Sequence, residues 1–250
     1  MGKHDLGYKE LFSHPRMIED LLRGFVKHEW LAQVDFATLE RVNATYISKR
    51  MRQREEDMVW RVRFKTHWLY IYILLEFQSS IDRFMAVRML SYLSLFYEDL
   101  LKREKDIKLL PPLLPLVLYN GKKRWDAQTE VSRLVEFTAG RLKDYQVNFR
   151  YLIIDEGAFS ESQVVKERNL AGLLFRLEQS HNPKEMEEAV KLLMEWLADE
   201  KGSELYRSFI AWFQRVFITL RYPDVKFTPP QDLQEVRNML AERVLEWKED

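Results

Sequence analysis

The chain has 250 residues, of which 46% are hydrophobic, 31% charged and 13% aromatic, so an ordinary globular protein is indicated and wholesale disorder or a collagen-like structure is excluded. It contains no cysteine, which excludes disulfide scaffolds, thiolate metal sites and cysteine nucleophiles. The formal net charge is zero, with 39 basic and 39 acidic residues, and this overall balance alone argues against a nucleic-acid binder.

The first half of the chain predicts a helix followed by three strands and a second helix. Residues 15–30 carry apolar side chains at helical spacing after Pro15. Residues 42–48 and 58–64 read as strands, and the second alternates apolar and polar side chains. Residues 68–77 are apolar on both faces, which favours a central strand joined to its neighbour by a turn at Thr66-His67. Residues 83–101 then repeat apolar side chains with helical periodicity.

The second half of the chain predicts two more strands and then only helices. Strands are expected at 114–119 and 149–154, with a helix over 128–142 between them and a break near Gly140. Four further helices are expected at 163–179, 183–197, 204–220 and 231–248. This order predicts an α/β fold with a mixed sheet flanked by helices. We expect one domain over residues 1–157 and a helical C-terminal extension over residues 158–250, which leaves a homodimer contact open.

No targeting or membrane segment is recognisable in the sequence. The first residues lack the apolar stretch of a secretory signal. The longest apolar run, residues 68–75, is too short to span a bilayer. The expectation is a soluble cytoplasmic protein without a membrane partner.

The zero net charge conceals an asymmetry along the chain. Residues 1–154 hold 26 basic and 20 acidic residues, whereas residues 155–250 hold 13 and 19. Within the basic half, residues 41–67 combine eight bases with only three acids. Such a segment can attract a polyanion, although a solvated strand face would have the same composition.

Three polar residues lie where two predicted strands end. Asp57 opens the alternating strand, and Glu76 and Gln78 close the central strand two residues apart. If the two strands pair in antiparallel fashion, these carboxylates and the amide converge at one edge of the sheet. A carboxylate beside a buried strand is costly unless it is paired, protonated or bound to a metal, and oxygen ligands suit Mg²⁺ or Mn²⁺. Alternatively, Glu76 and Gln78 are simply the residues where the strand reaches solvent.

Five sequence blocks, in this order, give the chain a family resemblance. They are HDLGYKELFSHP, REEDMVWRV, ILLEFQSS, FMAVRMLSY and LPLVLYNGKKRW, between His4 and Trp125. The set resembles the Rpn, YhgA-like family of recombination-promoting nucleases and transposase-like proteins, which belongs to the PD-(D/E)XK nuclease superfamily. The resemblance implies a restriction-endonuclease-like core of a helix, three strands, a helix and a strand, in agreement with the order derived from periodicity.

The resemblance also implies roles for individual residues. Asp57 and Glu76 would bind the metal, together with the backbone carbonyl of Phe77. Gln78 stands where the superfamily usually has lysine, and the family commonly has this EFQ form. Glutamine can orient water but carries no charge, so the cationic group would come from elsewhere. Lys9, four residues after Asp5 on a predicted helix, and Arg88 on the helix after the central strand are the two candidates, although either could instead form a surface salt bridge.

The leading hypothesis is therefore a Mg²⁺-dependent endonuclease acting on DNA, with Mn²⁺ as an alternative ion. Basic residues of the 41–67 segment would hold the DNA backbone without reading its sequence: Arg50, Arg52, Arg54, Arg61 and Arg63, with Arg88 nearby. Two alternatives stay open. One is a non-catalytic nucleic-acid-binding or protein-binding remnant of a transposase-like protein, and the other is a nuclease that cuts RNA or acts in defence.

Overall fold

The computed structural model describes residues 3–42, 57–76, 81–136, 140–159, 168–180, 182–218 and 228–246, and for residues 3–5, 57, 76 and 243–246 it describes the backbone alone. The chain divides into two compact units. Residues 29–158 form a unit built around a sheet, here called the sheet unit. Residues 1–28 and 159–250 form a second unit, here called the helical unit.

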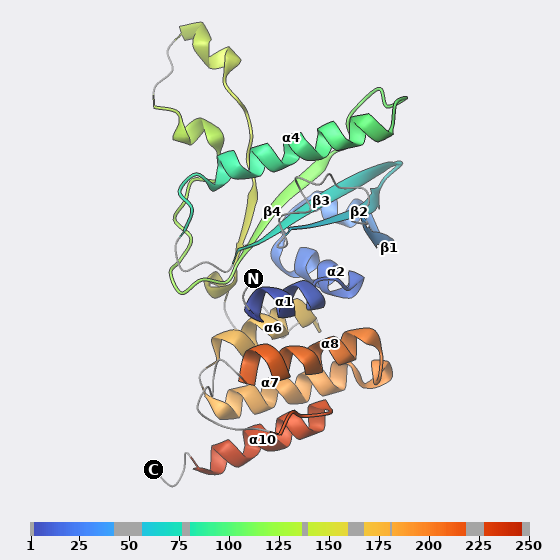
Figure 1. Ribbon diagram of the computed structural model, residues 1–250, viewed down its shortest axis with the longest axis vertical. Coiled ribbons are helices and arrows are strands. Elements are labelled where there is room, and N and C mark those ends of the chain that lie inside the picture. The colour runs from blue at the N-terminus through green and yellow to red at the C-terminus, as the bar shows by residue number, and fades with distance from the viewer. Residues whose placement is uncertain are drawn as a thin grey trace. The chain divides into compact units, whose positions relative to one another are not determined.

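The sheet unit contains a five-stranded mixed sheet in the order β1-β2-β3-β4-β5 (Figure 1). Its strands are β1 (Val34–Arg41), β2 (Asp57–Phe64), β3 (His67–Glu76), β4 (Leu113–Tyr119) and β5 (Leu152–Asp155). The strands β1, β2 and β3 pair in antiparallel fashion, whereas β3, β4 and β5 are parallel. This architecture confirms the predicted α/β class and is consistent with a restriction-endonuclease-like fold.

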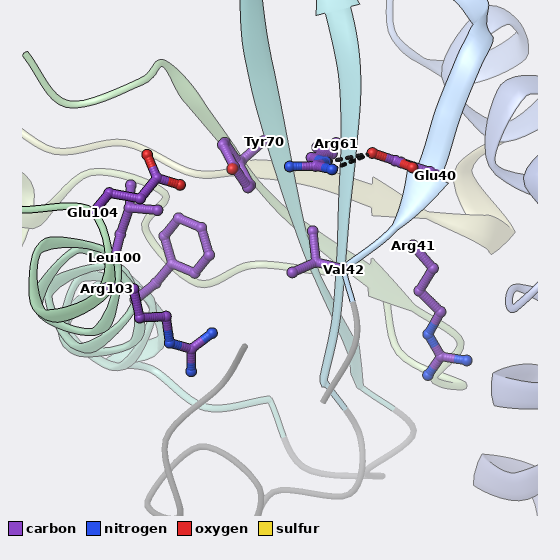
Figure 2. Close-up of a pocket in the computed structure, with 9 residues that line it drawn as sticks. Glu40, Arg41, Val42, Arg61, Tyr70, Leu100, Arg103 and Glu104 are labelled. Carbon is purple, nitrogen blue, oxygen red and sulfur yellow. Dashed lines mark hydrogen bonds and ion pairs between the residues drawn. The ribbon is translucent and has the colours of Figure 1, made fainter. Parts of the chain in front are cut away.

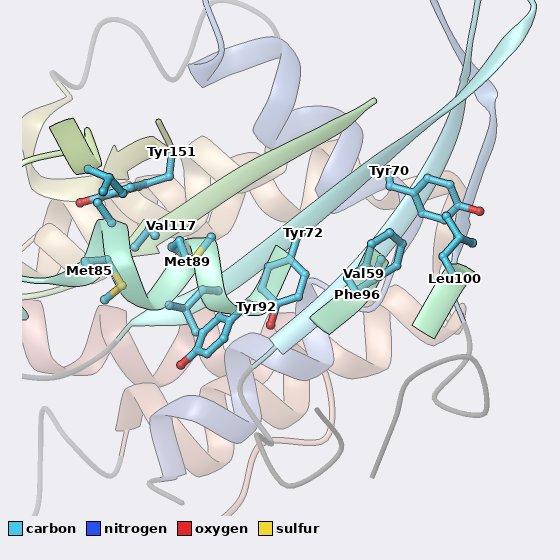
Figure 3. Packing of buried hydrophobic residues seen from close by; sticks show 13 residues of the cluster. Val59, Tyr70, Tyr72, Met85, Met89, Tyr92, Phe96, Leu100, Val117 and Tyr151 are labelled. Atoms are coloured by element: carbon cyan, nitrogen blue, oxygen red, sulfur yellow. The ribbon is translucent and has the colours of Figure 1, made fainter. Parts of the chain in front are cut away.

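A long helix, α4 (Met85–Arg103), crosses one face of this sheet (Figure 1). Its apolar stripe packs on alternate residues of the central strands, and Tyr72, Tyr92 and Phe96 belong to the shared buried cluster (Figure 3). Most of the other residues of β2 and β3, on the opposite face, are also buried, among them Trp60 and Ile71. Burial on both faces is why residues 68–75 are apolar throughout.

The first described strand is β1, at Val34–Arg41, where no strand was predicted. The strand predicted at 42–48 lies, apart from Val42, outside the described part of the chain. The register of β1 with β2 shifts between Asp35 and Glu40, so β1 carries an irregularity. A bulge breaks the two-residue alternation by which strands are recognised in a sequence.

The helix predicted over 128–142 is wrong for the described residues of that segment. They form two short 3₁₀ helices, η3 (Val131–Leu134) and η4 (Gly140–Tyr145). Val135 has extended backbone angles and Gly140 has a φ of +55°, and neither conformation continues a helix. The strand β5 also begins later than predicted, because Arg150 and Tyr151 pair instead with Glu130 and Thr129.

The helical unit combines helices from both ends of the chain. Its helices are α1 (Lys3–Leu11), α2 (Pro15–Phe25), α6 (Leu170–Gln179), α7 (Pro183–Trp196), α8 (Glu204–Trp212) and α10 (Leu233–Glu246), with short helical turns η7 (Ala198–Glu200) and η8 (Phe213–Phe217). Within the unit α1 packs on α8, α2 on α6, and α7 on both α6 and α10. The four helices predicted in the last part of the chain correspond to α6, α7, α8 and α10. The helices α1 and α2 group with these C-terminal helices rather than with the sheet. The division at residue 157 stays a prediction.

Candidate active site at the carboxyl edge of the sheet

The three parallel strands end at the same edge of the sheet. Glu76 of β3 pairs in register with Tyr119 of β4, and Tyr119 pairs with Asp155 of β5. Neighbours in such a row share one face, and in each strand this is the face covered by α4. The carboxyl ends of parallel strands in an open α/β sheet are where ligands are usually bound.

The hairpin of β2 and β3 brings Asp57 to the same edge. Asp57 pairs with Leu74, two residues before Glu76, so positions 57 and 76 lie on one face as diagonal neighbours. Diagonal positions across an antiparallel pair are about 7–8 Å apart, a separation at which two carboxylates can reach one ion. Their roles as metal ligands stay predictions.

A tight turn at Lys65-Thr66 sets this register, because Phe64 pairs with His67. The predicted turn at Thr66-His67 is therefore wrong by one residue. Lys65 adopts a φ of +53°, the left-handed conformation that a short connection between two strands requires.

The first turns of α4 place Arg88 on the face that carries positions 57 and 76. Arg88 Nε donates a hydrogen bond to the Tyr92 hydroxyl, and one Arg88 amino group lies 4.0 Å from an Asp82 carboxylate oxygen. The Tyr92 ring in turn lies 5.9 Å from the ring of Tyr72, on the same face of β3 as Glu76. The Arg88 side chain remains 26% exposed, so its guanidinium is held but still accessible to a substrate.

A second set of polar contacts closes the edge beside β5. Asp155 accepts hydrogen bonds from the Arg124 guanidinium at 2.7 Å and from the backbone N–H of Trp125 at 2.9 Å. Trp125 donates its indole N–H to the Tyr151 hydroxyl at 3.0 Å. Burial raises the pKa of Tyr151 to about 12, and the negative charge of Asp82 adds to the rise although the bond from Trp125 lowers it. Sequence reasoning missed this network, and the signal that could have found it is an aspartate at the carboxyl end of a predicted strand.

Arg61 and Arg63 lie on the same face of β2 as Asp57, as their alternation predicts. Their guanidiniums lie 4.5 and 4.0 Å from the centre of the Trp68 ring. Arg61 also forms an ion pair of 2.5 Å with Glu40. Both arginines are therefore fixed near the hairpin turn, at the other end of the strands from positions 57 and 76.

The remaining predicted site residues are not brought to this edge by the described structure. Lys9 and the backbone of Asp5 belong to α1 in the helical unit, so their part in the site stays a prediction. Phe77, Gln78 and the three arginines Arg50, Arg52 and Arg54 lie outside the described residues. Among side chains that the structure describes, no group of three acidic or histidine residues could hold a metal ion.

Comparison with known proteins decides the family. The family model described as "Putative transposase, YhgA-like" matches residues 2–205, which is most of the chain. This chain belongs to the YhgA-like family. The match covers the whole sheet unit and continues into α8 of the helical unit, so the family sequence pattern includes the edge described above.

Three curated relatives illustrate what the family contains. The recombination-promoting nuclease RpnD of Escherichia coli O157:H7 is 24% identical over 71% of this chain and 67% of its own length. The protein RpnE of Escherichia coli K12, named an inactive recombination-promoting nuclease-like protein, is 24% identical over 71% of this chain and 58% of its own length. The recombination-promoting nuclease RpnA of the same strain is 29% identical over 47% of this chain and 40% of its own length. This member of the YhgA-like family therefore matches only part of each relative.

No solved structure matches the chain significantly. In the described part of the chain, none of the helices has both the length and the apolar character needed to cross a membrane.

Proposed function

We propose that this protein is a metal-dependent endonuclease that hydrolyses phosphodiester bonds of DNA in recombination. The observation that carries the proposal is the β2–β3 register, which puts positions 57 and 76 on one sheet face at its carboxyl edge. Membership of the YhgA-like family and the names of RpnD and RpnA support a nuclease role.

In this proposal Asp57 and Glu76 hold Mg²⁺ or Mn²⁺, with the carbonyl of Phe77 as a further ligand. Carboxylate and carbonyl oxygens are the donors these ions prefer, and two carboxylates on one face fit a site for a single ion. The bound metal supplies a more acidic water and neutralises charge on the phosphate. Gln78 orients the attacking water through its amide.

The positive charge that lysine usually supplies comes in this proposal from Arg88. Its hydrogen bond to Tyr92 and its approach to Asp82 aim it along the face that carries positions 57 and 76. A guanidinium presents several N–H donors in a fixed plane, which suits a phosphate whose charge increases in the transition state. Lys9 remains the alternative.

Nicking of supercoiled plasmid DNA tests the proposal. Wild-type protein is expected to nick in the presence of Mg²⁺ and to stop when the metal is chelated, and Asp57→Asn and Glu76→Gln are each expected to lose nearly all cleavage. Asp144→Asn is the matched control, because Asp144 is exposed on η4 and far along the chain from positions 57 and 76. If correctly folded Asp57→Asn protein cuts like wild type, the assignment of the metal site is wrong.

A second candidate function is a binding protein that does not cut. It is favoured by the similarity to RpnE, whose name states that it is inactive. This candidate predicts DNA binding without metal-dependent nicking by the wild-type chain. An RNA substrate in the same assay decides whether the nuclease acts on DNA or on RNA.

A further inference from the structure

A cavity of about 320 Å³ lies between the sheet and the C-terminal half of α4 (Figure 2). Its floor is apolar and aromatic and includes Tyr70, Phe96 and Leu100. The rings of Tyr70 and Phe96 are 5.1 Å apart between centres, and both side chains are more than nine-tenths buried. The volume is at the small end of the range for ligand pockets, so the cavity suits one small molecule or one unit of a polymer.

One wall of the cavity is a guanidinium that is already held in place. Arg61 donates to Glu40 at 2.5 Å, forms a hydrogen bond with the Tyr70 hydroxyl, and lies over the Trp68 ring. Arg61 and Tyr70 lie side by side in Figure 2, opposite Leu100 of α4. These partners already fix the guanidinium. A ligand that accepts hydrogen bonds from its remaining N–H groups therefore costs little side-chain conformational entropy on binding.

The rim of the cavity carries charges of both signs. Arg103 and Glu104, at the end of α4, stand on one side, and the ion pair of Glu40 with Arg61 stands on the other. The rim thus offers cations for an anion and carboxylates for N–H donors of one ligand.

The cavity lies on the same sheet face as the proposed metal site. Arg61 follows Asp57 by four residues on β2, and Tyr70 precedes Glu76 by six on β3. Four residues of a strand span about 13 Å, which is the rise of about four base pairs of duplex DNA. A nucleic-acid strand cut at the edge can therefore have a nucleotide within reach of the cavity.

We propose that this cavity binds one nucleotide unit, a base with its phosphate, from the substrate of the nuclease. The base rests on the floor formed by Tyr70, Phe96 and Leu100, and its N–H groups donate to the carboxylates of the rim. The phosphate accepts from Arg103 and Arg61. An inorganic anion would leave the floor unused and would face two carboxylates, whereas a purely apolar ligand would desolvate the rim charges without replacing their hydrogen bonds. This inference rests on the proposed nuclease function and adds a contact away from the reacting phosphate.

Fluorescence anisotropy tests the proposal on full-length Asp57→Asn protein, in the presence of a metal chelator so that no strand is cut. The probe is a labelled single-stranded DNA oligonucleotide with a 5′-phosphate, and the competitors are the same oligonucleotide without the phosphate, a free nucleoside monophosphate, and inorganic phosphate. Arg103→Glu reverses a rim charge, and Leu100→Trp fills the cavity. Lys102→Glu is the matched control, because Lys102 lies next to Arg103 on α4 and does not line the cavity.

Both cavity variants are expected to weaken binding by about tenfold or more, because Arg103→Glu loses a charge-assisted contact and Leu100→Trp occupies the space for the base. Lys102→Glu is expected to bind nearly as tightly as the Asp57→Asn protein. Competition by the free nucleoside monophosphate would show that the cavity also binds a soluble nucleotide. Competition only by the phosphorylated oligonucleotide would show that the cavity binds the end of a strand. Unchanged binding in Arg103→Glu and in folded Leu100→Trp, or equal competition by inorganic phosphate, would overturn the proposal. Because binding is measured without cleavage, this result is independent of whether Asp57→Asn abolishes nicking.

Discussion

At the scale of single residues, Asp155 fixes the loop that follows β4. Its two carboxylate oxygens accept from Arg124 and from the backbone N–H of Trp125, and its side chain is only 10% exposed. Gly157 lies against the same guanidinium, since a Cβ there would come within 1.9 Å of an Arg124 nitrogen. The loop from Gly121 to Trp125 is thereby tied to the carboxyl edge next to position 76.

Asp155→Ala is expected to lower the free energy of unfolding by about 3 kcal/mol, because two hydrogen bonds to a buried carboxylate are lost and a buried N–H is left unpaired. Arg124→Gln, which removes a half-exposed cation and leaves the bond to Trp125, is expected to cost only about 1 kcal/mol. Urea unfolding of both variants measures the difference. Equal losses would mean that the ion pair, rather than the backbone bond, holds the loop.

Gln78 tests the proposed chemistry at one position. Gln78→Lys restores the residue usual in the superfamily and is expected to retain or increase Mg²⁺-dependent nicking. Gln78→Leu has a similar size but cannot orient water, so a loss of roughly a hundredfold in cleavage rate is expected. Equal nicking rates for leucine and glutamine would assign position 78 a structural role only.

At the scale of elements, a carboxylate from α2 caps the N-terminus of α6. Asp20 Oδ2 accepts from the backbone N–H of Leu170 at 2.7 Å, and its backbone carbonyl accepts from the Asn169 amide. Asn169 also caps α6 from its own side chain, through the N–H of Gly172. Burial raises the pKa of Asp20 to about 6, although the bond from Leu170 and the charge of Arg16 lower it.

This raised pKa predicts how stability depends on pH. The folded state binds the Asp20 proton more tightly than the unfolded state, whose pKa is near 3.8, so this contribution to stability falls as pH rises from about 4 to about 6 and is constant above that range. Asp20→Asn keeps an acceptor for Leu170 and cannot ionise. It is therefore expected to be about 2–3 kcal/mol more stable, relative to wild type, at pH 8 than at pH 4.

Thermal unfolding across that pH range measures the effect, with Glu98→Gln as the control. Glu98 lies on α4, in the sheet unit, and pairs at the surface with Lys102. Its substitution should leave the pH profile unchanged. A profile for Asp20→Asn parallel to that of wild type would show that Asp20 does not titrate in this window.

At the scale of the whole molecule, the two units carry opposite net charges. The sheet unit holds 21 basic and 18 acidic residues, and the helical unit holds 18 basic and 21 acidic residues. The asymmetry along the sequence therefore becomes a difference between folded units. We therefore expect a polyanion to be attracted to the sheet unit, which also carries the proposed metal site.

Non-specific DNA binding is accordingly expected to weaken as salt rises, and each phosphate contact contributes about −0.9 to the slope of log K against log salt. Replacing Arg50, Arg52 and Arg54 by glutamine should flatten that slope by about two to three units, if all three contact phosphate. Anisotropy titrations between low and moderate salt measure it. The control is the same charge change at Lys184, Lys191 and Lys201 in the helical unit. An unchanged slope in the arginine variant would show that Arg50, Arg52 and Arg54 do not contact DNA phosphates.

The fold was predictable where one kind of periodicity runs unbroken. The uninterrupted apolar run of β3 and the helical stripe of α4 reveal their elements because burial selects side chains at a constant period. The strand β1 was not predicted because its register shift interrupts the alternation, and the segment between β4 and β5 was misjudged because Val135 and Gly140 leave the helical conformation.

The candidate site was predictable only for residues that stand out within one strand. Glu76 is conspicuous because a carboxylate ends an apolar strand. Of the Asp155 network, the sequence shows only an aspartate at the end of a predicted strand, since the contacts of Arg124 and Tyr151 depend on β4 and β5 being neighbours. Sequence distance hides such pairs, because hydrogen bonds between loops follow only from the completed sheet.

The discontinuous origin of the helical unit has a consequence for synthesis. The buried face of α2, with Met17, Leu21 and Leu22, packs on α6, which begins at Leu170. At ribosomal speeds of about 5–20 residues per second, the nascent α2 waits roughly 10–30 s for its partner. During that time the sheet unit can finish folding behind it, while an apolar helix face stays available to chaperones on the ribosome. Completion of the helical unit is therefore a late event, and a chain that stops before α6 would present that face permanently to the cell's quality control.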